Sequence, residues 1–238
     1  MKRNKVFLFL LTSLLVSTHS SKANNSLFNF NEVNIGINIL PATRFGTDYF
    51  LYHEFKLSYS SGVLINLLNQ KSIGFTTGIQ YSTIWELGKS QTYRFDPTSQ
   101  STPYPNDSLV SRVQYGYAFR FIDIPLLMCF SIGNAKTKFT LNGGLLVNYF
   151  INSKSTSQLI YSDNHSVDYS GTSSENYINR IQFAPAISLG IQEAISNNLL
   201  FKFEPTLRYQ ILTYKGYEAG GIHFWLFGCN FVILKRFK

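Results

Sequence analysis

The sequence predicts an all-β protein, an eight-stranded antiparallel up-and-down transmembrane β-barrel. Eight segments alternate apolar and polar residues with a period of two, as strands with two different faces do. The connections between them alternate between long polar loops and short turns, which is typical of outer-membrane barrels. Charged residues make up 14% of the chain and aromatic residues 16%. After the N-terminal region no apolar run reaches about 18 residues, so helices that span a membrane are not expected.

Residues 200–211 show the pattern most clearly. Phe201 and its alternate neighbours form one apolar face, and Lys202, Glu204 and Arg208 lie on the other. A soluble lipocalin-like barrel or sandwich would turn the apolar face inward, whereas an outer-membrane barrel turns it toward lipid and fills its lumen with the charged face. The soluble alternative explains neither the Gly, Ser, Asn and Thr on the opposite faces nor the aromatic residues near strand ends, so the membrane barrel is favoured.

The N-terminus predicts export. Lys2, Arg3 and Lys5 precede an uncharged run over residues 6–16, and small residues follow near Ala23. This is the pattern of a signal peptide over residues 1–23, and it leaves 24–238 as one barrel domain. The predicted peptide carries four basic residues and no acid, so its removal lowers the formal charge from +8 to +4. The remaining charge is spread along the chain, which argues against a nucleic-acid partner.

The strands are expected in a simple order. They cover residues 33–40, 55–68, 72–82 with an extension toward 93, 113–130, 138–152, 180–193, 200–211 and 222–237. Long loops are expected at 41–54, 95–111, 153–177 and 215–221, and short turns at 69–71, 133–136 and 196–198. The last strand should close on the first, because an open sheet edge in hydrocarbon leaves backbone groups without hydrogen bonds. Both termini are then periplasmic and the four long loops external.

Three prolines within these strands argue against the assignment. Pro125, Pro185 and Pro205 each remove a donor from the hydrogen-bond ladder at mid-strand. A tilted barrel absorbs such a loss through local bulges, so the barrel prediction stands.

Several strands are similar to those of a known family. The carrying motifs are Phe-Ile-Asp-Ile-Pro-Leu-Leu at 121–127, Gly-Gly-Leu-Leu-Val-Asn-Tyr at 143–149, Ile-Ser-Leu-Gly-Ile at 187–191 and residues 200–209. Together they resemble the small outer-membrane β-barrel domain family of Bacteroidota, the PorT-like barrels. The resemblance implies the barrel fold, and PorT itself is implicated in type IX secretion. Asp123 stands where the family more often has Glu. The motifs describe strands and no active site.

Five charged residues are predicted to form a polar network in the lumen: Asp123, Lys202, Glu204, Arg208 and Arg236. Eight strands enclose an interior that is only wide enough for side chains to fill. We therefore expect these charges to pair with one another as a plug, and not to line an open pore.

No catalytic, cofactor or metal site is expected. An outer-membrane lipid-modifying enzyme needs a nucleophile and a base on one face near the rim, and no His-x-Ser pair lies on a strand. His53 and His165 fall in loops, and His223 begins the last strand. Asp163, His165 and Asp168 lack the regular spacing of a cation site. Cys129 and Cys229 are too few for a disulfide framework, although a single bridge remains open.

The expected protein is a monomer in the cell outer membrane, with lipid around it. Its role is structural, or that of a binding or secretion and assembly partner acting through its long external loops. The alternatives are a narrow channel for small solutes, which requires that the lumen charges separate, and a lipid-modifying enzyme. Tyr81, Tyr149, Tyr209 and Trp225 are candidates for the aromatic belts at the membrane interfaces.

Overall fold

The computed structural model describes residues 32–45, 53–69, 72–92, 110–173, 178–213 and 222–237. The predicted signal peptide, residues 95–109 of the third connection and the loop at 215–221 lie outside these ranges. No helix in the described ranges has the length and apolar character needed to cross a membrane.

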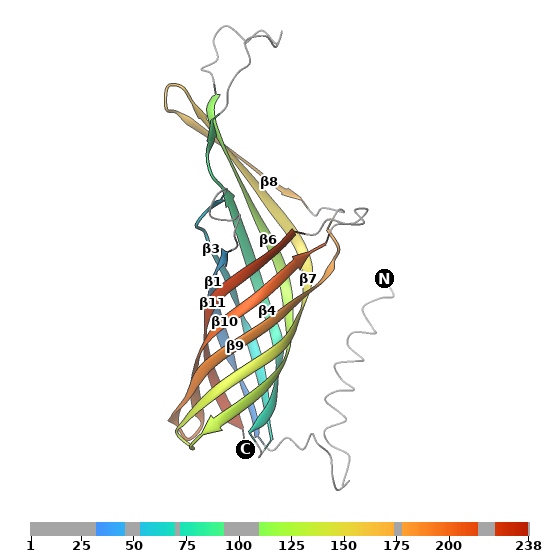
Figure 1. Cartoon of the computed structure of the whole chain (residues 1–238), viewed down its shortest axis with the longest axis vertical. Coiled ribbons are helices and arrows are strands. Elements are labelled where there is room, and N and C mark those ends of the chain that lie inside the picture. Colours follow the sequence, from blue (N-terminus) through green and yellow to red (C-terminus); the bar gives the residue numbers. More distant parts are fainter. Residues whose placement is uncertain are drawn as a thin grey trace.

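The described residues form one antiparallel sheet that closes into a barrel (Figure 1). Its strands are β1 (Glu32–Phe45), β2 (His53–Glu54), β3 (Leu57–Leu68), β4 (Ile73–Gly88), β5 (Gln91–Thr92), β6 (Val110–Gly133), β7 (Thr137–Tyr161), β8 (Ser166–Ser173), β9 (Ile181–Ser196), β10 (Leu199–Leu212) and β11 (Ile222–Phe237). The ring runs β1, β3, β4, β6, β7, β9, β10, β11 and back to β1. These are the eight predicted strands in sequence order, so the up-and-down barrel prediction is confirmed.

The two ends of the barrel differ. The turns between β3 and β4, β6 and β7, and β9 and β10 lie at one end with Glu32 and Phe237, and we call this the turn end. At the opposite end β6 and β7 continue well past the ring (Figure 1), with 24 and 25 residues against 12 to 16 in the other ring strands. Residues 110–118, 154–161 and β8 make up this extension, which we call the ribbon, at the ribbon end.

The prediction of a long loop at 153–177 is wrong, because most of this segment forms strands of the ribbon. β7 runs on to Tyr161, turns, and returns as β8, which pairs with it from Ser153 opposite Ser173 to Ile160 opposite Ser166. Asn164 takes a left-handed φ of 66° in the turn, a conformation that Asn tolerates. The predicted third loop is also shorter than expected at its end, because β6 already begins at Val110. The first loop is shorter too, because β1 continues past Leu40 to Phe45.

The ring strands turn their polar faces inward. On β1, Asn38 is 2% exposed while its neighbour Ile37 is 60% exposed. The outward row of β6 is apolar from the turn end upward: Ile132, Phe130, Met128, Leu126, Ile124 and Ile122. This is the reverse of a soluble protein, in which large apolar side chains are buried.

Each proline in the ring lies at an interruption of one ladder. Between β4 and β6 the paired residues skip from Thr76 opposite Leu127 to Gln80 opposite Asp123, with Pro125 in the gap. The β9 and β10 ladder skips around Pro205, the β1 and β11 ladder skips around Pro41, and Pro185 lies just past the last β9 and β10 pair. On its other edge each of these prolines has a cross-strand partner. At Pro41, Pro125 and Pro205 the barrel therefore loses only local pairing, and the register resumes unchanged.

A bulge in β7 changes which residues face outward near the ribbon end. Arg120 lies opposite Asn152, but the next residue, Phe121, lies opposite Phe150, so Ile151 is the extra residue. Uninterrupted alternation along β7 would place Asn152 on the lumen face, with Asn142 and Asn148. Because the bulge shifts the alternation by one residue, Asn152 instead shares the outward face with Tyr149.

Candidate functional site: the polar lumen

The inward row of β10 shows how the lumen is built. From the turn end it reads Leu200, Lys202, Glu204, Thr206, Arg208, Gln210 and Leu212, and every member is buried. Polar residues occupy the middle and a leucine stands at each end. The two leucines belong to separate apolar clusters, so the polar section of the lumen is closed above and below.

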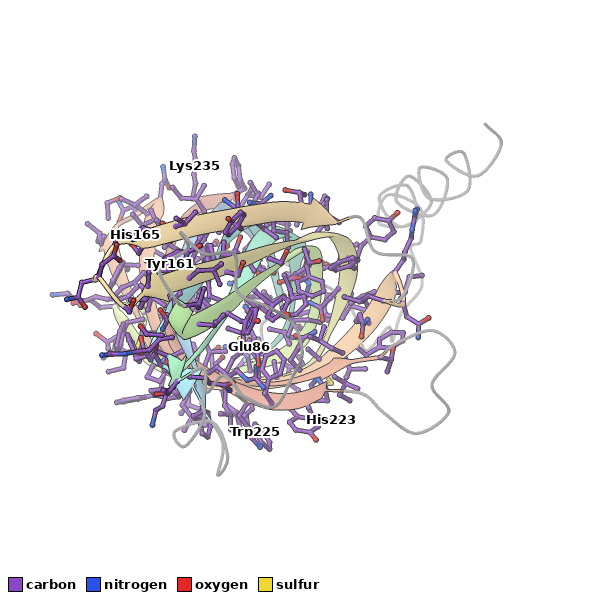
Figure 2. All side chains as sticks on the ribbon, turned by 90° about the horizontal axis from the view of Figure 1, so that it is seen from above. Glu86, Tyr161, His165, His223, Trp225 and Lys235 are labelled. Atoms are coloured by element: carbon purple, nitrogen blue, oxygen red, sulfur yellow. The ribbon has the colours of Figure 1, made fainter. Side chains whose placement is uncertain are left out.

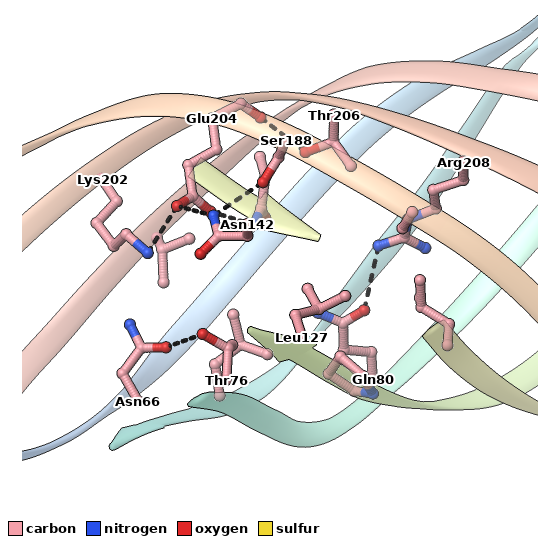
Figure 3. A pocket seen from close by; sticks show the side chains of 16 residues that line it. Asn66, Thr76, Gln80, Leu127, Asn142, Ser188, Lys202, Glu204, Thr206 and Arg208 are labelled. Carbon is pink, nitrogen blue, oxygen red and sulfur yellow. Dashed lines mark hydrogen bonds and ion pairs between the residues drawn. The ribbon is translucent and has the colours of Figure 1, made fainter. Parts of the chain in front are cut away.

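Glu204 is the centre of the first polar cluster. Its Oε1 lies 2.6 Å from Lys202 Nζ and accepts a hydrogen bond from Asn142 Nδ2 at 2.8 Å (Figure 3). Thr140 Oγ1 donates to the same oxygen at 3.2 Å. Asn230 Nδ2 donates to Oε2 at 3.4 Å. A buried carboxylate is tolerable only with such a shell of donors, because its charge has lost its water. We call these residues the Glu204 cluster.

Arg208 is the centre of the second polar cluster in the lumen. Its Nη2 donates to Gln80 Oε1 at 3.3 Å (Figure 3). Its Nη1 donates to Ser60 Oγ at 3.2 Å and lies 3.6 Å from Asp123 Oδ2. Asn148 Nδ2 donates to Asp123 Oδ1 at 2.6 Å. The planar guanidinium reaches several acceptors at once, which suits a crowded interior. We call these residues the Arg208 cluster.

Together the two clusters reach all eight ring strands. Ser60, Gln80, Asp123 and Asn148 bring in β3, β4, β6 and β7, while β9 and β1 join through two further hydrogen bonds. Asn142 donates to Ser188 Oγ at 2.9 Å, and Asn38 donates to Asn230 Oδ1 at 3.0 Å. The polar lumen thus links all eight ring strands through side-chain contacts, several of which cross the barrel.

Arg236 stands apart from the other predicted lumen residues. It lies at the turn end, where its Nε donates to Glu32 Oε1 at 3.0 Å. The other four predicted residues fall into two ion pairs, Lys202 with Glu204 and Asp123 with Arg208. The predicted network is therefore divided in space.

Little empty space remains between these side chains. A cavity of about 30 Å³ lies among Asn66, Gln80, Asn142, Glu204 and Arg208, and a second of about 10 Å³ lies near Asp123 and Gln210. Asn142 Oδ1 and Arg208 Nε are buried without a hydrogen-bond partner in the first cavity. A water molecule needs roughly 10–15 Å³ of such volume, so this cavity suits an ordered water or two.

Apolar side chains close the lumen on both sides. At the ribbon end the cluster consists of Ile84, Phe119, Phe121, Phe150, Ile178, Leu212, Phe224 and Leu226. At the turn end it consists of Leu64, Leu200, Val232 and Leu234. Viewed along the barrel, side chains fill the ring, with Glu86 inside it and Trp225 and His223 pointing away from it (Figure 2).

Sequence reasoning missed one ion pair in this interior. Arg44 Nη1 lies 2.8 Å from Glu86 Oε2, and the Arg44 guanidinium lies 4.2 Å above the Phe224 ring. The sequence predicts Arg44 within the loop at 41–54, which begins at Pro41. The usable signal was that Ala42 and Arg44 continue the inward alternation of Asn38 and Leu40.

The described polar side chains of the lumen interact with one another through ion pairs and hydrogen bonds. The described residues contain no group of three or more His, Cys, Asp or Glu side chains that could hold a metal ion. His165 lies in the turn of the ribbon, where it stacks on Tyr161 at 4.1 Å between ring centroids and contacts Asp163. Cys129 is buried and Cys229 partly exposed, and both are free thiols.

Residues 11–211 match the family described as outer membrane protein beta-barrel domain. The chain belongs to this family. Its location is the cell outer membrane, and the apolar exterior of the barrel faces lipid. No curated protein matches the sequence.

The chain is also similar to solved outer-membrane barrels. It shares 6% identity with neisserial surface protein A over 86% of this chain and 97% of that one, with a TM-score of 0.45. It shares 10% identity with Ail, the attachment invasion locus protein of Yersinia pestis, over 87% of this chain and 98% of that one, with a TM-score of 0.37. It shares 8% identity with the outer membrane protease OmpT of Escherichia coli over 91% of this chain and 98% of that one, with a TM-score of 0.37.

The predicted belt residues lie on the lipid-facing exterior. Tyr81, Tyr149 and Trp225 are each about two-fifths exposed, and Tyr209 packs against Trp225 with ring centroids 4.7 Å apart. Such amphipathic rings are enriched where hydrocarbon meets the polar head groups.

Proposed function

We propose that this protein is a closed, non-enzymatic, monomeric anchor that displays the ribbon outside the cell as a binding element. The observation that carries the proposal is the contrast between a filled lumen and two strands that run well beyond the ring. In this proposal the four lumen charges of the two clusters act as a structural plug.

The filled lumen supports the closed state. A permeating ion would have to separate Lys202 from Glu204 and pass the apolar cluster at each end. Separating a buried ion pair leaves both charges without compensation in a low-dielectric interior, so an open, conducting state is less stable than the closed one.

The ribbon supports the binding role. Tyr115 on β6 lies opposite Ser157 on β7, which lies opposite Tyr169 on β8, so the three side chains form one row across one face. Both tyrosines are about half exposed. Tyrosine flanked by small hydroxyl side chains gives a large, rigid contact area at low cost in side-chain entropy, as in antibody binding loops. A protein partner in the cell envelope or in a secretion assembly fits this surface. The resemblance to PorT-like barrels of Bacteroidota is consistent with such a partner.

The orientation is tested by labelling in intact cells. A single cysteine at Tyr169, in a chain with Cys129 and Cys229 changed to serine, should react with a membrane-impermeant maleimide. A cysteine in place of Ser196, at the turn end, should react only after the outer membrane is permeabilised. The opposite labelling pattern would refute external display of the ribbon.

The binding role is tested by a shortened ribbon. Lys154 lies opposite Thr172, so residues 155–171 can be replaced by Asn-Gly, which closes a two-residue hairpin. We expect a heat-modifiable barrel in the outer membrane that has lost the protein adducts formed by a photo-crosslinker at Tyr115. A photo-crosslinker at Phe183, on the lipid face, is the control and should give no discrete adduct.

Planar bilayers test closure. We expect no defined unitary conductance from the purified protein. A conductance that changes with Asp123→Asn or Arg208→Gln would establish the narrow channel instead.

A further inference from the structure

The outward face of the barrel changes character around its circumference at the ribbon end. On β1, β10 and β11 this face ends in the aromatic group Phe45, Tyr209, His223 and Trp225. On β6, β7 and β9 it ends instead in cations. Arg120 follows Ile122 in the outward row of β6, and Arg180 immediately precedes Ile181 at the start of β9.

Neutral acceptors on β7 hold both guanidinium groups. Arg120 Nη1 donates to Asn152 Oδ1 at 3.4 Å, and Arg180 Nη1 donates to Tyr149 Oη at 3.3 Å. The bulge at Ile151 is what places Tyr149 and Asn152 on the same outward face. The two arginines therefore flank one strand, on strands that neighbour it at about 4.8 Å on either side.

These two charges are not neutralised within the described part of the chain. No described carboxylate forms an ion pair with Arg120 or Arg180, whereas the inward cations Lys202, Arg208 and Arg236 each have one. Lys154, two residues beyond Asn152 on the same face, adds a third cation without a described acidic partner. Cations fixed by uncharged groups at the edge of an apolar surface leave an anion to be supplied from outside the chain.

We propose that Arg120, Arg180 and Lys154 bind the phosphate of a phosphorylated glycolipid in the outer leaflet. The site adjoins the lipid-facing surface, so a ligand with acyl chains can lie along Ile122 and Ile181 while its head group reaches the arginines. Guanidinium groups match phosphate oxygens in a bidentate geometry, and electrostatic attraction is strong at such an interface. The outer-leaflet assignment rests on the proposed orientation, but the phosphate site does not.

Lipid binding to the detergent-purified full chain tests the site. The probe is bis-phosphorylated lipid A, compared with the same lipid after removal of its phosphates, and bound lipid is counted by native mass spectrometry. We expect Arg120→Gln with Arg180→Gln to weaken binding at least tenfold. Lys235→Gln is the matched control, because Lys235 is an outward cation at the turn end that lies 5.4 Å from the Phe237 ring centroid. The Lys235→Gln variant should bind the phosphorylated lipid as tightly as the unmodified protein does.

The remaining arms decide the chemistry. Arg120→Lys with Arg180→Lys keeps the charge and removes the planar fork, so intermediate affinity is expected; heat modifiability confirms that each variant is folded. Equal binding by the double glutamine variant, or by the phosphate-free lipid, would overturn the site. Inorganic phosphate that displaces the lipid at equal concentration would overturn the lipid as its source. Lipid binding together with a ribbon labelled only from the periplasm would overturn the outer-leaflet assignment and the proposed display, while the phosphate site would remain.

Discussion

The lumen and the ribbon are built from the same polar residue types and use them in opposite ways. In the lumen, Asn38, Asn142 and Ser188 are buried and their hydrogen bonds cross from strand to strand. In the ribbon, Ser155, Ser170 and Thr172 are exposed to solvent. Identical side chains are therefore structural where the barrel excludes water and replaceable where it does not. The comparison predicts a gradient of mutational cost from the Glu204 cluster to the ribbon.

The largest loss of stability is expected for Glu204→Gln. This change leaves Lys202 as a buried charge without its carboxylate, which should lower the free energy of unfolding by about 3–5 kcal/mol. Equilibrium unfolding in urea, in lipid vesicles, measures the loss. The second variant, Glu204→Gln with Lys202→Met, removes the stranded charge and should recover most of the stability. A double variant as unstable as the single one would mean that packing, and not charge, sets the cost.

A smaller loss is expected for Gly190→Ala, which tests how tightly the lumen is packed. A Cβ at Gly190 would lie 2.5 Å from both Glu204 Cγ and the Phe203 carbonyl oxygen. Overpacking of this kind costs about 1–3 kcal/mol. Gly143→Ala is the matched control, because nothing lies within 4 Å of the added atom. Equal unfolding midpoints for the two variants would contradict a filled lumen.

Arg236→Gln should cost about 1 kcal/mol or less. Its pair with Glu32 is partly open, with side chains 12% and 24% exposed, and water weakens such pairs. Added salt should shrink the difference between this variant and the unmodified protein. A loss as large as that of Glu204→Gln would place Arg236 in the central network after all.

Tyr169→Ser should change the free energy of unfolding by no more than about 0.5 kcal/mol, because the side chain is exposed and distant from the ring. Circular dichroism during thermal unfolding is a sufficient measurement. A large destabilisation would show that the ribbon is part of the folding unit of the barrel.

The same contrast explains what could be predicted from the sequence. The ring strands were predictable because lipid on one side and a polar lumen on the other impose alternation, as in Phe201 beside Lys202. The ribbon was not, because water reaches both of its faces and residues 153–161 carry no apolar period. The bulge at Ile151 has no local signal in the sequence. The strand predicted over 33–40 continues past Pro41 to Phe45, because the ladder between β1 and β11 is interrupted there and then resumes.

Within the candidate site, the identity of the charged residues was predictable and their partners were not. Lys202 and Glu204 pair within one strand, whereas Arg208 and Asp123 lie 85 positions apart and meet only through the barrel cross-section. Contacts of that kind depend on the stagger of the strands, which alternation alone does not determine.

The hydrogen bond from Asn38 to Asn230 joins the first ring strand to the last, as does the contact of Arg236 with Glu32. Neither can form until the two ends of the sheet have met. We call the pairing of β1 with β11 the seam. A seam that slipped by a single residue would turn Asn38 toward lipid and Ile37 toward the Glu204 cluster. The interior therefore favours correct closure, because a slipped seam leaves Asn230 Oδ1 buried without the donor that Asn38 supplies.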